Sequence, residues 1–293
     1  MFRSLRQDSK LEISEKYRSG LEDAGLGTFE ALLTTPGNSR LDKPGLADWR
    51  TRLVIDLPDG TTCFLKRYDR PPLSEQLEQR LAGHPSTASA EWGWMQRFFQ
   101  LGLPGPEPVA YGLRRGGLML EKASVVVTAK VPGESLEKWA PREAEPGGRL
   151  GSRRFKNALI HESARVVARM HEAGLYHRDL YLAHLYFDDQ TAEGDDTPRL
   201  RLTMIDLQRV IQPRLLAFRW MVKDLASLHY STPIQVASRS DRIRWLRSYL
   251  SRRRLRLMLI PRSLRPRLLA YLVEYKKNRI SRHDRRRRAR FSR

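Results

Sequence analysis

The order of apolar and polar positions divides the chain into a strand-rich part followed by a helix-rich part. Between residues 50 and 67, Leu53, Ile55 and Leu57 alternate with polar residues, Pro-Asp-Gly at 58–60 gives a turn signal, and apolar residues resume at 63. This pattern predicts an antiparallel hairpin. Helical spacing follows between 86 and 101. Further strands are predicted at residues 108–112 and 118–128.

After residue 131 the apolar spacing is mainly that of helices. Pro132-Gly133 breaks the pattern, a helix is predicted from about 135, and residues 157–173 form a long amphipathic helix closed by Gly174. Residues 188–199 are typical of a hairpin with an acidic tip, and 239–250 of another helix. Strands with one helix, followed by helices, predict an α+β fold of two lobes that join near residues 130–134.

The ends of the chain lie outside this two-lobe pattern. Residues 4–25 carry a weak apolar stripe, which we interpret as a helix. We therefore expect an N-terminal helical extension over residues 1–27, a strand-rich lobe over 28–131, a mainly helical lobe over 132–275, and a basic, disordered tail over 276–293.

Composition agrees with a folded intracellular protein. The chain has 293 residues, of which 40% are hydrophobic, which is enough apolar material for a core. Its single cysteine, Cys63, leaves no intramolecular disulfide, and the N-terminus does not resemble a secretion signal. No apolar run approaches the roughly 20 residues that span a bilayer. We expect a protein of a reducing compartment.

The positive charge is concentrated near the C-terminus. The formal net charge is +21, and residues 239–293 hold 21 Lys and Arg against 3 Asp and Glu, so they carry +18. Four successive arginines stand at 285–288. Such a segment serves solubility, binds anionic lipid headgroups, or binds the phosphates of a nucleic acid. The sequence alone leaves these three interpretations open.

The clearest chemical motif follows the predicted helix 157–173. His177, Arg178 and Asp179 match the start of the kinase catalytic loop, H-R-D-x-x-x-x-N, in which a base and a metal ligand stand five residues apart. The last position holds His184 rather than asparagine. The tripeptide alone is common, so its interpretation depends on the residues that accompany it.

Three other residues occur in the order that a kinase requires. Asp206 follows an apolar strand, at the position of a carboxylate that binds a phosphate-bound metal. Lys66 lies in the second strand of the predicted hairpin, and Glu91 lies on the helix of the same lobe. Taken alone, a residue such as Lys66 is more often a solvated edge residue, and one such as Glu91 an exposed helix residue. Their common order on the expected elements favours a kinase.

Three segments extend this similarity to a particular family. Residues 176–185, 205–209 and 219–228 resemble the lipopolysaccharide core heptose kinases of the WaaP/InaA type, within the protein-kinase-like superfamily, whose catalytic loop ends in histidine at the position of His184. The resemblance covers roughly residues 30–250. It implies a bilobal protein-kinase-like fold, with an antiparallel-sheet N-lobe that has one αC-type helix and a mainly helical C-lobe.

The resemblance also implies the chemistry. The protein would transfer a phosphoryl group from ATP, with Mg²⁺, to a sugar hydroxyl of the heptose or Kdo type in lipopolysaccharide core or a related glycolipid. Asp179 would accept the hydroxyl proton, and Asp206 would hold the metal. Lys66, paired with Glu91, would bind the α and β phosphates. His184 would be a second metal ligand or, because imidazole is a poor ligand for Mg²⁺, a hydrogen-bonding residue.

The remaining candidates are structural or bind adenine through the backbone. Asp224 matches the buried helix aspartate that accepts hydrogen bonds from the catalytic loop, and we expect His177 and Arg178 to be structural as well. Adenine would be recognised by the backbone near Ala129 and Val131. Two further glycines, Gly37 and Gly45, are the only candidates for a loop over the phosphates.

We therefore expect an ATP-dependent kinase in the cytoplasm, located peripherally at the cytoplasmic face of the inner membrane through its basic tail. The segment after Asp206 is too short for a long activation loop, which argues against a protein acceptor. The alternatives are a small-molecule or protein kinase of the same fold, or a non-catalytic kinase-like module that docks through its tail to nucleic acid or membrane. A nucleic-acid partner is disfavoured, because the last eighteen residues contain only Phe291 as a stacking aromatic.

Overall fold

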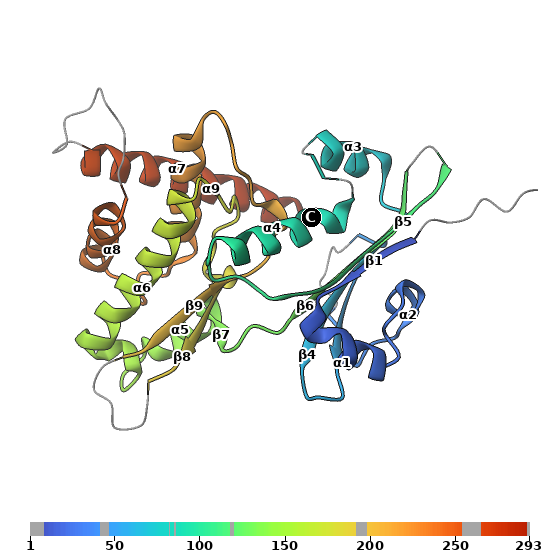
Figure 1. Ribbon diagram of the computed structural model, residues 1–293. Helices are drawn as coiled ribbons and strands as arrows, with labels where there is room; N and C mark the ends of the chain where they lie inside the picture. The colour runs from blue at the N-terminus through green and yellow to red at the C-terminus, as the bar shows by residue number, and fades with distance from the viewer. Residues whose placement is uncertain are drawn as a thin grey trace, which may run out of the picture. The chain divides into compact units, whose positions relative to one another are not determined.

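The chain forms two compact units. The computed structural model describes residues 9–41, 47–81, 83–84, 86–117, 120–191, 198–253 and 265–291. Unit 1 contains Met1–Gln100, Gly105–Val131 and Asp206–Gln208, and unit 2 contains Leu101–Pro104, Pro132–Ile205 and Arg209–Arg293 (Figure 1). No helix within the described ranges is long and apolar enough to cross a lipid bilayer.

Unit 1 is built on a six-stranded antiparallel sheet with the order β1-β5-β6-β4-β3-β2. Its strands are β1 (Ser9–Ile13), β2 (Ser39–Arg40), β3 (Arg50–Asp56), β4 (Thr62–Asp69), β5 (Pro108–Arg115) and β6 (Glu121–Ala129). The predicted hairpin is β3–β4, in which Leu53 lies opposite Leu65. The antiparallel hairpin predicted from the period of two is therefore confirmed.

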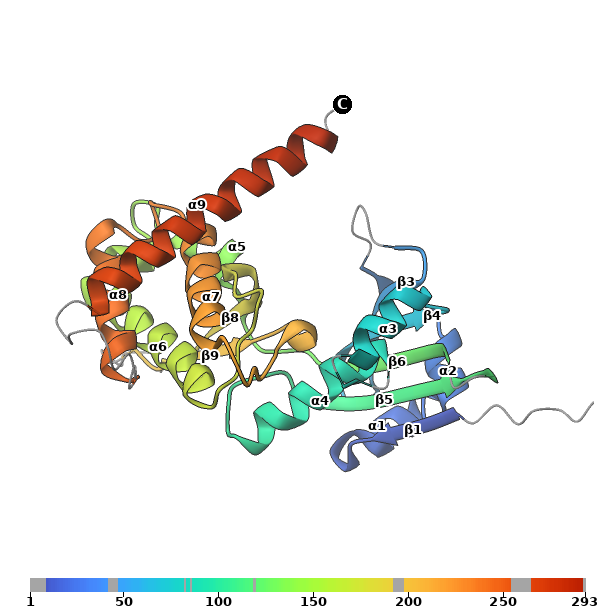
Figure 2. The ribbon, with the colours of Figure 1, turned by 90° about the horizontal axis from the view of Figure 1, so that it is seen from above.

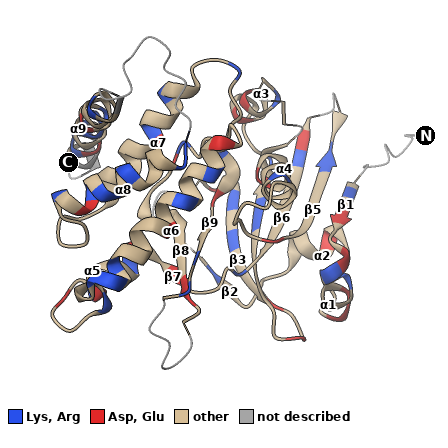
Figure 3. Cartoon of the chain, turned by 60° about the vertical axis from the view of Figure 1, so that its left-hand side comes forward, with Lys and Arg blue, Asp and Glu red and all other residues tan. Residues whose placement is uncertain are grey.

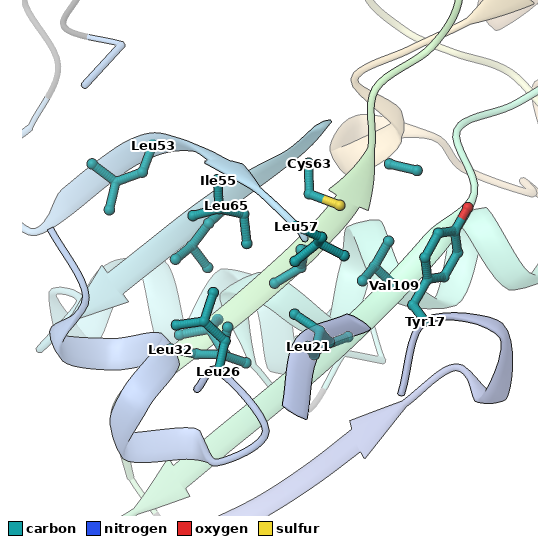
Figure 4. Packing of buried hydrophobic residues seen from close by; sticks show 14 of the residues in the cluster. Tyr17, Leu21, Leu26, Leu32, Leu53, Ile55, Leu57, Cys63, Leu65 and Val109 are labelled. Carbon is teal, nitrogen blue, oxygen red and sulfur yellow. The ribbon is translucent and has the colours of Figure 1, made fainter. Parts of the chain in front are cut away.

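Helices cover both faces of this sheet. They are α1 (Arg18–Asp23), which follows the 3-10 turn η1 (Glu15–Tyr17), and α2 (Phe29–Thr34), α3 (Leu73–Leu81) and α4 (Thr87–Gln100). Helices α1 and α2 lie on one face and α4 on the other (Figure 2). Helix α4 is the one predicted between 86 and 101, and α1 lies within the helix predicted over residues 4–25, whereas α2 and α3 were not predicted. The core under α1 and α2 is formed mainly by Leu21, Leu26, Leu32, Leu53, Ile55, Leu57, Leu65 and Val109 (Figure 4).

The prediction of a helix over residues 4–25 is wrong for its first described part. Residues Ser9–Ile13 form β1, which pairs with β5 along the edge of the sheet. Leu11 and Ile13 are spaced by two and pack against the core of unit 1. This spacing fits a strand better than a helix, because alternate residues of a strand point to the same face. Helix α1 begins only at Arg18.

Unit 2 consists of helices and a small sheet. The helices are α5 (Leu136–Glu143), α6 (Arg153–Glu172), α7 (Ala217–Ser231), α8 (Arg239–Ser251) and α9 (Arg265–Phe291), with 3-10 turns η3 (Arg149–Gly151) and η4 (Leu182–His184). Strands β7 (Glu134–Ser135), β8 (Leu185–Asp189) and β9 (Leu200–Met204) pair antiparallel in that order. The helices predicted at 157–173 and 239–250 correspond to α6 and α8, and the predicted acidic hairpin to β8–β9. Residues 192–197 of its tip lie outside the described residues.

The prediction of a disordered tail over residues 276–293 is also wrong, because the chain continues to Phe291 as helix α9. The helix packs along α7, and Leu269 on it is fully buried. Tyr230 donates a hydrogen bond to Asp284 at 2.7 Å, and Glu274 lies 2.7 Å from His229. These contacts offset the repulsion among the basic residues of α8 and α9 (Figure 3).

Candidate active site

Three charged residues predicted from the sequence meet in unit 1. Leu65 on β4 points into the core, so the neighbouring Lys66 points to the opposite face, which α4 covers. There Lys66 Nζ lies 2.8 Å from both carboxylate oxygens of Glu91, a residue of α4 that is only 2% exposed. Lys66 Nζ also lies 3.4 Å from Asp206 Oδ1. The sheet and the helix thus bring one ammonium group to two carboxylates.

This arrangement fixes the charge of Lys66. Burial by itself would lower the pKa of Lys66, but the carboxylates of Glu91 and Asp206 outweigh burial and raise the pKa above its ordinary value. Lys66 is therefore fully protonated at neutral pH. A protonated ammonium group that is held in place can bind a phosphate oxygen.

A buried carboxylate on β6 holds the first turn of α4. Glu121 accepts a hydrogen bond from the backbone N–H of Thr87 at 2.9 Å and from its hydroxyl at 3.2 Å. The hydroxyl of Ser124 donates to the other carboxylate oxygen of Glu121. Burial raises the pKa of Glu121, and these three donors act against that rise. Glu121 therefore anchors the helix that carries Glu91 to the sheet that carries Lys66.

Asp206 follows β9 with an unusual backbone conformation. Its φ angle is +60°, in the left-handed region that non-glycine residues rarely adopt. The preceding Ile205 donates its N–H to the carbonyl of His184 at 2.9 Å. Strained residues of this kind concentrate at functional sites.

In unit 2, Asp224 holds the loop that follows α6. Its carboxylate is fully buried on α7 and accepts hydrogen bonds from the backbone N–H groups of His177 and Arg178, both at 2.7 Å. These are the contacts expected of Asp224 from the sequence. Arg178 has a φ angle of +68°, so the buried carboxylate holds a strained turn just before Asp179.

Asp224 is itself held by two residues that the sequence analysis missed. His171 Nε2 lies 3.3 Å from Asp224 Oδ2, and His171 Nδ1 lies 2.8 Å from the hydroxyl of Tyr249 on α8. Burial lowers the pKa of His171, so we assign the neutral ring, with Nε2–H donating to Asp224 and Nδ1 accepting from Tyr249. The period of three and four in α6 marked His171 as facing inward, but the sequence carried no sign of its partners.

Asp179 is surrounded by two cations that the sequence analysis also missed. Arg209 Nη1 donates to Asp179 Oδ2 at 2.8 Å and to Oδ1 at 3.2 Å, and Lys223 Nζ lies 3.6 Å from Oδ1. Lys223 also donates to the carbonyl of Arg178. Burial chiefly lowers the pKa of Lys223, and Arg209 acts in the same direction while Asp179 opposes it. Arg209 lies within a segment noted for its family resemblance, which was its only signal in the sequence.

His184 contacts the backbone of the catalytic loop. Its Nδ1 lies 2.7 Å from the carbonyl oxygen of Asp179, so Nδ1–H is the donor. Its ring stacks on that of His177, whose Nε2 lies 2.9 Å from the carbonyl of Ile205. His177 is fully buried. The tautomer of His184 puts the imidazole lone pair on Nε2.

The segment expected to bind adenine lies at the end of β6. Ala129 and Val131 are both buried. The N–H of Ala129 donates to the carbonyl of Glu107 at 3.1 Å, so that N–H is already in use. Of the two glycines considered for a phosphate loop, Gly37 has a φ angle of +70°, and a Cβ added to it would lie 2.9 Å from the carbonyl oxygen of Val54, too close for a side chain. Gly45 lies outside the described residues.

The carboxylate of Asp206 suits a magnesium ion. No group of three His, Cys, Asp or Glu side chains that could hold a metal occurs within the described part of the chain. Mg²⁺ is usually bound by one or two carboxylates together with substrate phosphates and water, so it needs no such group. The side chain of Asp206 is one-third exposed and stands beside Lys66, a phosphate-binding type of residue. The residues present therefore fit the ion.

Unit 2 also contains an apolar cavity of about 820 Å³. It lies among α5, α6, α7, α8 and α9, and its lining includes Leu136, Ala140, Leu159, Leu228, Leu246 and Val273. This cavity could not be predicted from the sequence, because its walls come from helices that are far apart along the chain.

A lysine paired with a glutamate beside an aspartate in unit 1, and a His-Arg-Asp loop held by a buried helix aspartate in unit 2, define a kinase. Residues 62–249 match the Lipopolysaccharide kinase (Kdo/WaaP) family, and the chain belongs to this family. It is an ATP-dependent kinase with the bilobal kinase-like fold expected from the sequence.

Individual relatives agree with this assignment. The chain is 32% identical over 233 residues to the lipopolysaccharide core heptose(I) kinase WaaP of Pseudomonas aeruginosa, covering 78% of this chain and 82% of the relative. It is 28% identical over 193 residues to WaaP of Escherichia coli K12, covering 65% and 71%. Among solved structures, WaaP in complex with acyl carrier protein has a TM-score of 0.65 at 30% identity, covering 92% of this chain and 98% of that one.

Proposed function

We propose that this protein transfers the γ-phosphoryl group of ATP to a sugar hydroxyl, of the heptose or Kdo type, in lipopolysaccharide core or a related glycolipid. The observation that carries the proposal is the Lys66–Glu91 ion pair beside Asp206 in a chain whose relatives are named heptose(I) kinases. Phosphoryl transfer needs positioning and charge neutralisation more than covalent chemistry, and these residues supply both.

The residues of unit 1 would bind the nucleotide. Lys66, kept protonated and oriented by Glu91, would bind the α and β phosphates. Asp206 would hold Mg²⁺, which neutralises charge on the phosphate oxygens when bound. Adenine would be recognised by backbone groups near Ala129 and Val131; because the Ala129 N–H donates to Glu107, Val131 is the better candidate donor.

Asp179 would act as the base that accepts the proton of the acceptor hydroxyl. Arg209 and Lys223 keep its carboxylate oriented. The side chain of Arg209 is 54% exposed, so it is accessible to a substrate. When the acceptor hydroxyl donates to Asp179, Arg209 would release the carboxylate and pair with the transferred phosphoryl group, as arginine does in other phosphotransferases.

His184 would position the catalytic loop through Nδ1, and its Nε2 remains the candidate second metal ligand. The variant His184→Asn tests this role. If Nε2 binds metal, the Mg²⁺ dependence of activity shifts. A decrease in activity with an unchanged Mg²⁺ dependence would assign His184 to loop positioning alone.

The test of the whole mechanism is phosphoryl transfer in Asp179→Asn and Asp206→Asn. We expect each to lower transfer from labelled ATP to the glycolipid by at least about a thousandfold, with an unchanged circular dichroism spectrum. Asp188→Asn, at a carboxylate of β8, is the matched control. Activity like that of the wild type in both variants would refute the mechanism.

The alternatives predict different acceptors. The segment between Asp206 and the first residue of α7, Ala217, is too short for a long activation loop, which supports an acceptor other than protein. Label in a protein or a small molecule instead of the glycolipid would favour another kinase of this fold. No ATP turnover, together with salt-sensitive binding to RNA, would favour a non-catalytic module.

The basic C-terminal part supports a cytoplasmic enzyme that acts at the inner membrane. Basic residues add about 1 kcal/mol each to binding at an anionic lipid surface. Helix α9 carries them as an ordered helix that packs on α7. Binding to anionic vesicles that weakens between 0.05 and about 0.5 M salt would support this location.

An acyl carrier protein is a second candidate partner, because a related WaaP was solved in complex with one. The apolar cavity of unit 2 would accept an acyl chain. Filling it with Ala140→Trp should then weaken co-purification with acylated carrier protein. The control is Ala289→Trp, at an exposed alanine near the end of α9 that is not among the residues lining the cavity. Ala270 is also exposed but lines the cavity, so it cannot serve as the control.

A further inference from the structure

Two leucines are exposed in the short segment that precedes α7. Leu215 is 80% exposed and Leu216 is 66% exposed. Arg214 and Arg219, both exposed, flank them, and no Asp or Glu occurs between residues 207 and 223. The segment therefore presents apolar side chains within a positively charged stretch.

Leucine at position 216 is unfavourable for the stability of the folded chain. It is the N-cap of α7, its side chain caps no N–H group, and its φ angle of +61° lies in the left-handed region. Leucine is among the least favourable N-cap residues, and asparagine would suit both the cap and the left-handed backbone better. A residue that lowers stability in two ways while exposing apolar surface is typical of a position selected for contact with another surface.

The exposed leucines are connected to the catalytic loop through α7. In the first turn of this helix, the ring of Trp220 lies under the guanidinium groups of Arg178 and Arg219, at 5.1 and 4.9 Å. One turn further along, Lys223 contacts Asp179. A surface that held the leucines would therefore be close to the residue that we propose as the base.

The positive surface continues from α7 onto α9. Burial chiefly lowers the pKa of Lys276 on α9, and the charges of Arg279 and Arg219 lower it further. Arg219 and Lys276 thus repel each other across the two helices. An anionic partner would relieve this repulsion.

We propose that residues 213–219 form a membrane-contact loop, in which Leu215 and Leu216 insert into an anionic bilayer that carries the acceptor glycolipid while Arg214 and Arg219 bind its headgroups. Stable attachment of a soluble protein to a bilayer usually needs two signals, and apolar insertion together with basic residues supplies them. The inference rests on the proposed function, because it assigns the surface on which that site meets a lipid-linked acceptor.

The test combines vesicle binding with two forms of the acceptor. We expect the double variant Leu215→Ser/Leu216→Ser to bind vesicles of phosphatidylethanolamine and phosphatidylglycerol about tenfold more weakly. Phosphorylation of glycolipid in these vesicles should fall in the same proportion, while kcat/KM for the delipidated core oligosaccharide stays unchanged. Leu81→Ser, at a leucine of α3 that is 81% exposed, is the control and should change neither.

A second variant separates binding from folding. Leu216→Asn should raise the melting temperature, because asparagine suits this N-cap, and should still weaken vesicle binding. The inference would be overturned if the double variant bound vesicles as well as the wild type does, or if Leu81→Ser lost as much vesicle binding as the double variant. It would also be overturned if the double variant lost equal activity on the glycolipid and on the delipidated oligosaccharide. That last result would assign the loop to chemistry or to a protein partner. If the wild type phosphorylates neither acceptor, the proposed function fails, whereas vesicle binding still decides the role of the loop.

Discussion

The ion pair between Lys66 and Glu91 illustrates how single residues determine this site. Lys66 Nζ has both Glu91 oxygens at 2.8 Å and Asp206 at 3.4 Å, and Glu91 is almost completely buried. Removing one partner of a buried pair leaves the other charge without compensation. The pair therefore fixes both the position and the charge of the lysine.

Replacing Glu91 by Gln should lower kcat/KM for ATP by about a hundredfold, because Lys66 would lose the carboxylate that orients it. Steady-state kinetics at varied ATP measures this effect. Glu78→Gln, at an exposed residue of α3, is the matched control. Kinetics of Glu91→Gln within a factor of two of the wild type would show that the pair has no part in nucleotide binding.

Histidines that are buried or half-buried should make the stability depend on pH. Burial lowers the pKa of His171, and likewise that of His229 and His84, so the folded chain takes up these protons less readily than the unfolded chain. Stability should therefore be constant with respect to these groups above about pH 6.5 and fall below it, by at most about 1.4 kcal/mol per pH unit for each histidine. Urea unfolding at pH 7.5, 6.5 and 5.5 measures this.

The variant His171→Asn identifies the contribution of one histidine. It should be less stable than the wild type at pH 7.5, because Tyr249 and Asp224 lose their partner, and its stability should fall less between pH 6.5 and 5.5. His283→Asn, at an exposed histidine of α9, is the matched control for the substitution itself. Identical slopes for the wild type and His171→Asn would contradict the assignment of a neutral buried ring.

Residues that belong to motifs could be predicted from the sequence, whereas their partners could not. Asp179, Asp206 and Asp224 were found by their spacing and flanking residues. Arg209 and Lys223, which contact Asp179, come from two other segments that only the fold brings to it. A pairing of this kind leaves no local pattern in one sequence.

At the scale of elements, the position of α4 depends on one buried carboxylate. Glu121 on β6 accepts both hydrogen bonds of Thr87 at the start of the helix, and Ser124 donates to it as well. Helix starts leave backbone N–H groups without partners, so a carboxylate there both satisfies a donor and complements the helix dipole. The element that carries Glu91 is thus held at its first turn.

Replacing Glu121 by Ala should remove the hydrogen bonds that hold the first turn of α4 to β6. We expect a loss of about 2–3 kcal/mol in the free energy of unfolding, because buried donors lose their acceptor, and a larger increase in KM for ATP than decrease in kcat. Hydrogen exchange of the amides at 87–91 should become faster. Glu121→Gln retains an acceptor oxygen and should recover most of KM; equal damage in both variants, without faster exchange, would contradict an anchoring role.

The helix α9 was missed because its composition is that of a disordered tail. Its basic residues repel one another, and only tertiary contacts such as the burial of Leu269 and the hydrogen bond between Tyr230 and Asp284 show that it packs. Similarly, β1 has only two apolar residues with strand spacing, Leu11 and Ile13, and its pairing with β5 shows that it is a strand. Elements with a strong internal pattern, such as β3, β4, α4 and α6, were predicted, and those that depend on a distant partner were not.

Replacing Leu269 by Ala should lower the free energy of unfolding by about 2–4 kcal/mol, as expected for a leucine buried in a well-packed interior. Tyr271→Ala, at a residue of the same helix that is largely exposed, should cost less than about 0.5 kcal/mol. Denaturant unfolding of the two variants gives the comparison. Equal, small effects would mean that α9 does not pack in solution.

For the molecule as a whole, the uneven distribution of charge follows the helices of unit 2. Residues 239–293 carry +18 of the net charge of +21, and helices α8 and α9 hold most of the described part of it as ordered structure. The sequence identified where the charge lies, but residues 276–293, which hold part of it, were expected to be a disordered tail. In the structure the charge belongs to the same unit as Asp179 and the exposed leucines before α7, and α9 packs along α7.

The central claim is that Asp179 is needed to place a phosphate on the sugar of an envelope glycolipid. Mass spectrometry of that glycolipid from a deletion strain, complemented with the wild type or with Asp179→Asn at equal protein levels, tests it most directly. The account predicts one phosphate more per molecule with the wild type than with Asp179→Asn, which should match the uncomplemented strain. Equal phosphate content in all three strains, or full restoration by Asp179→Asn, would contradict the account.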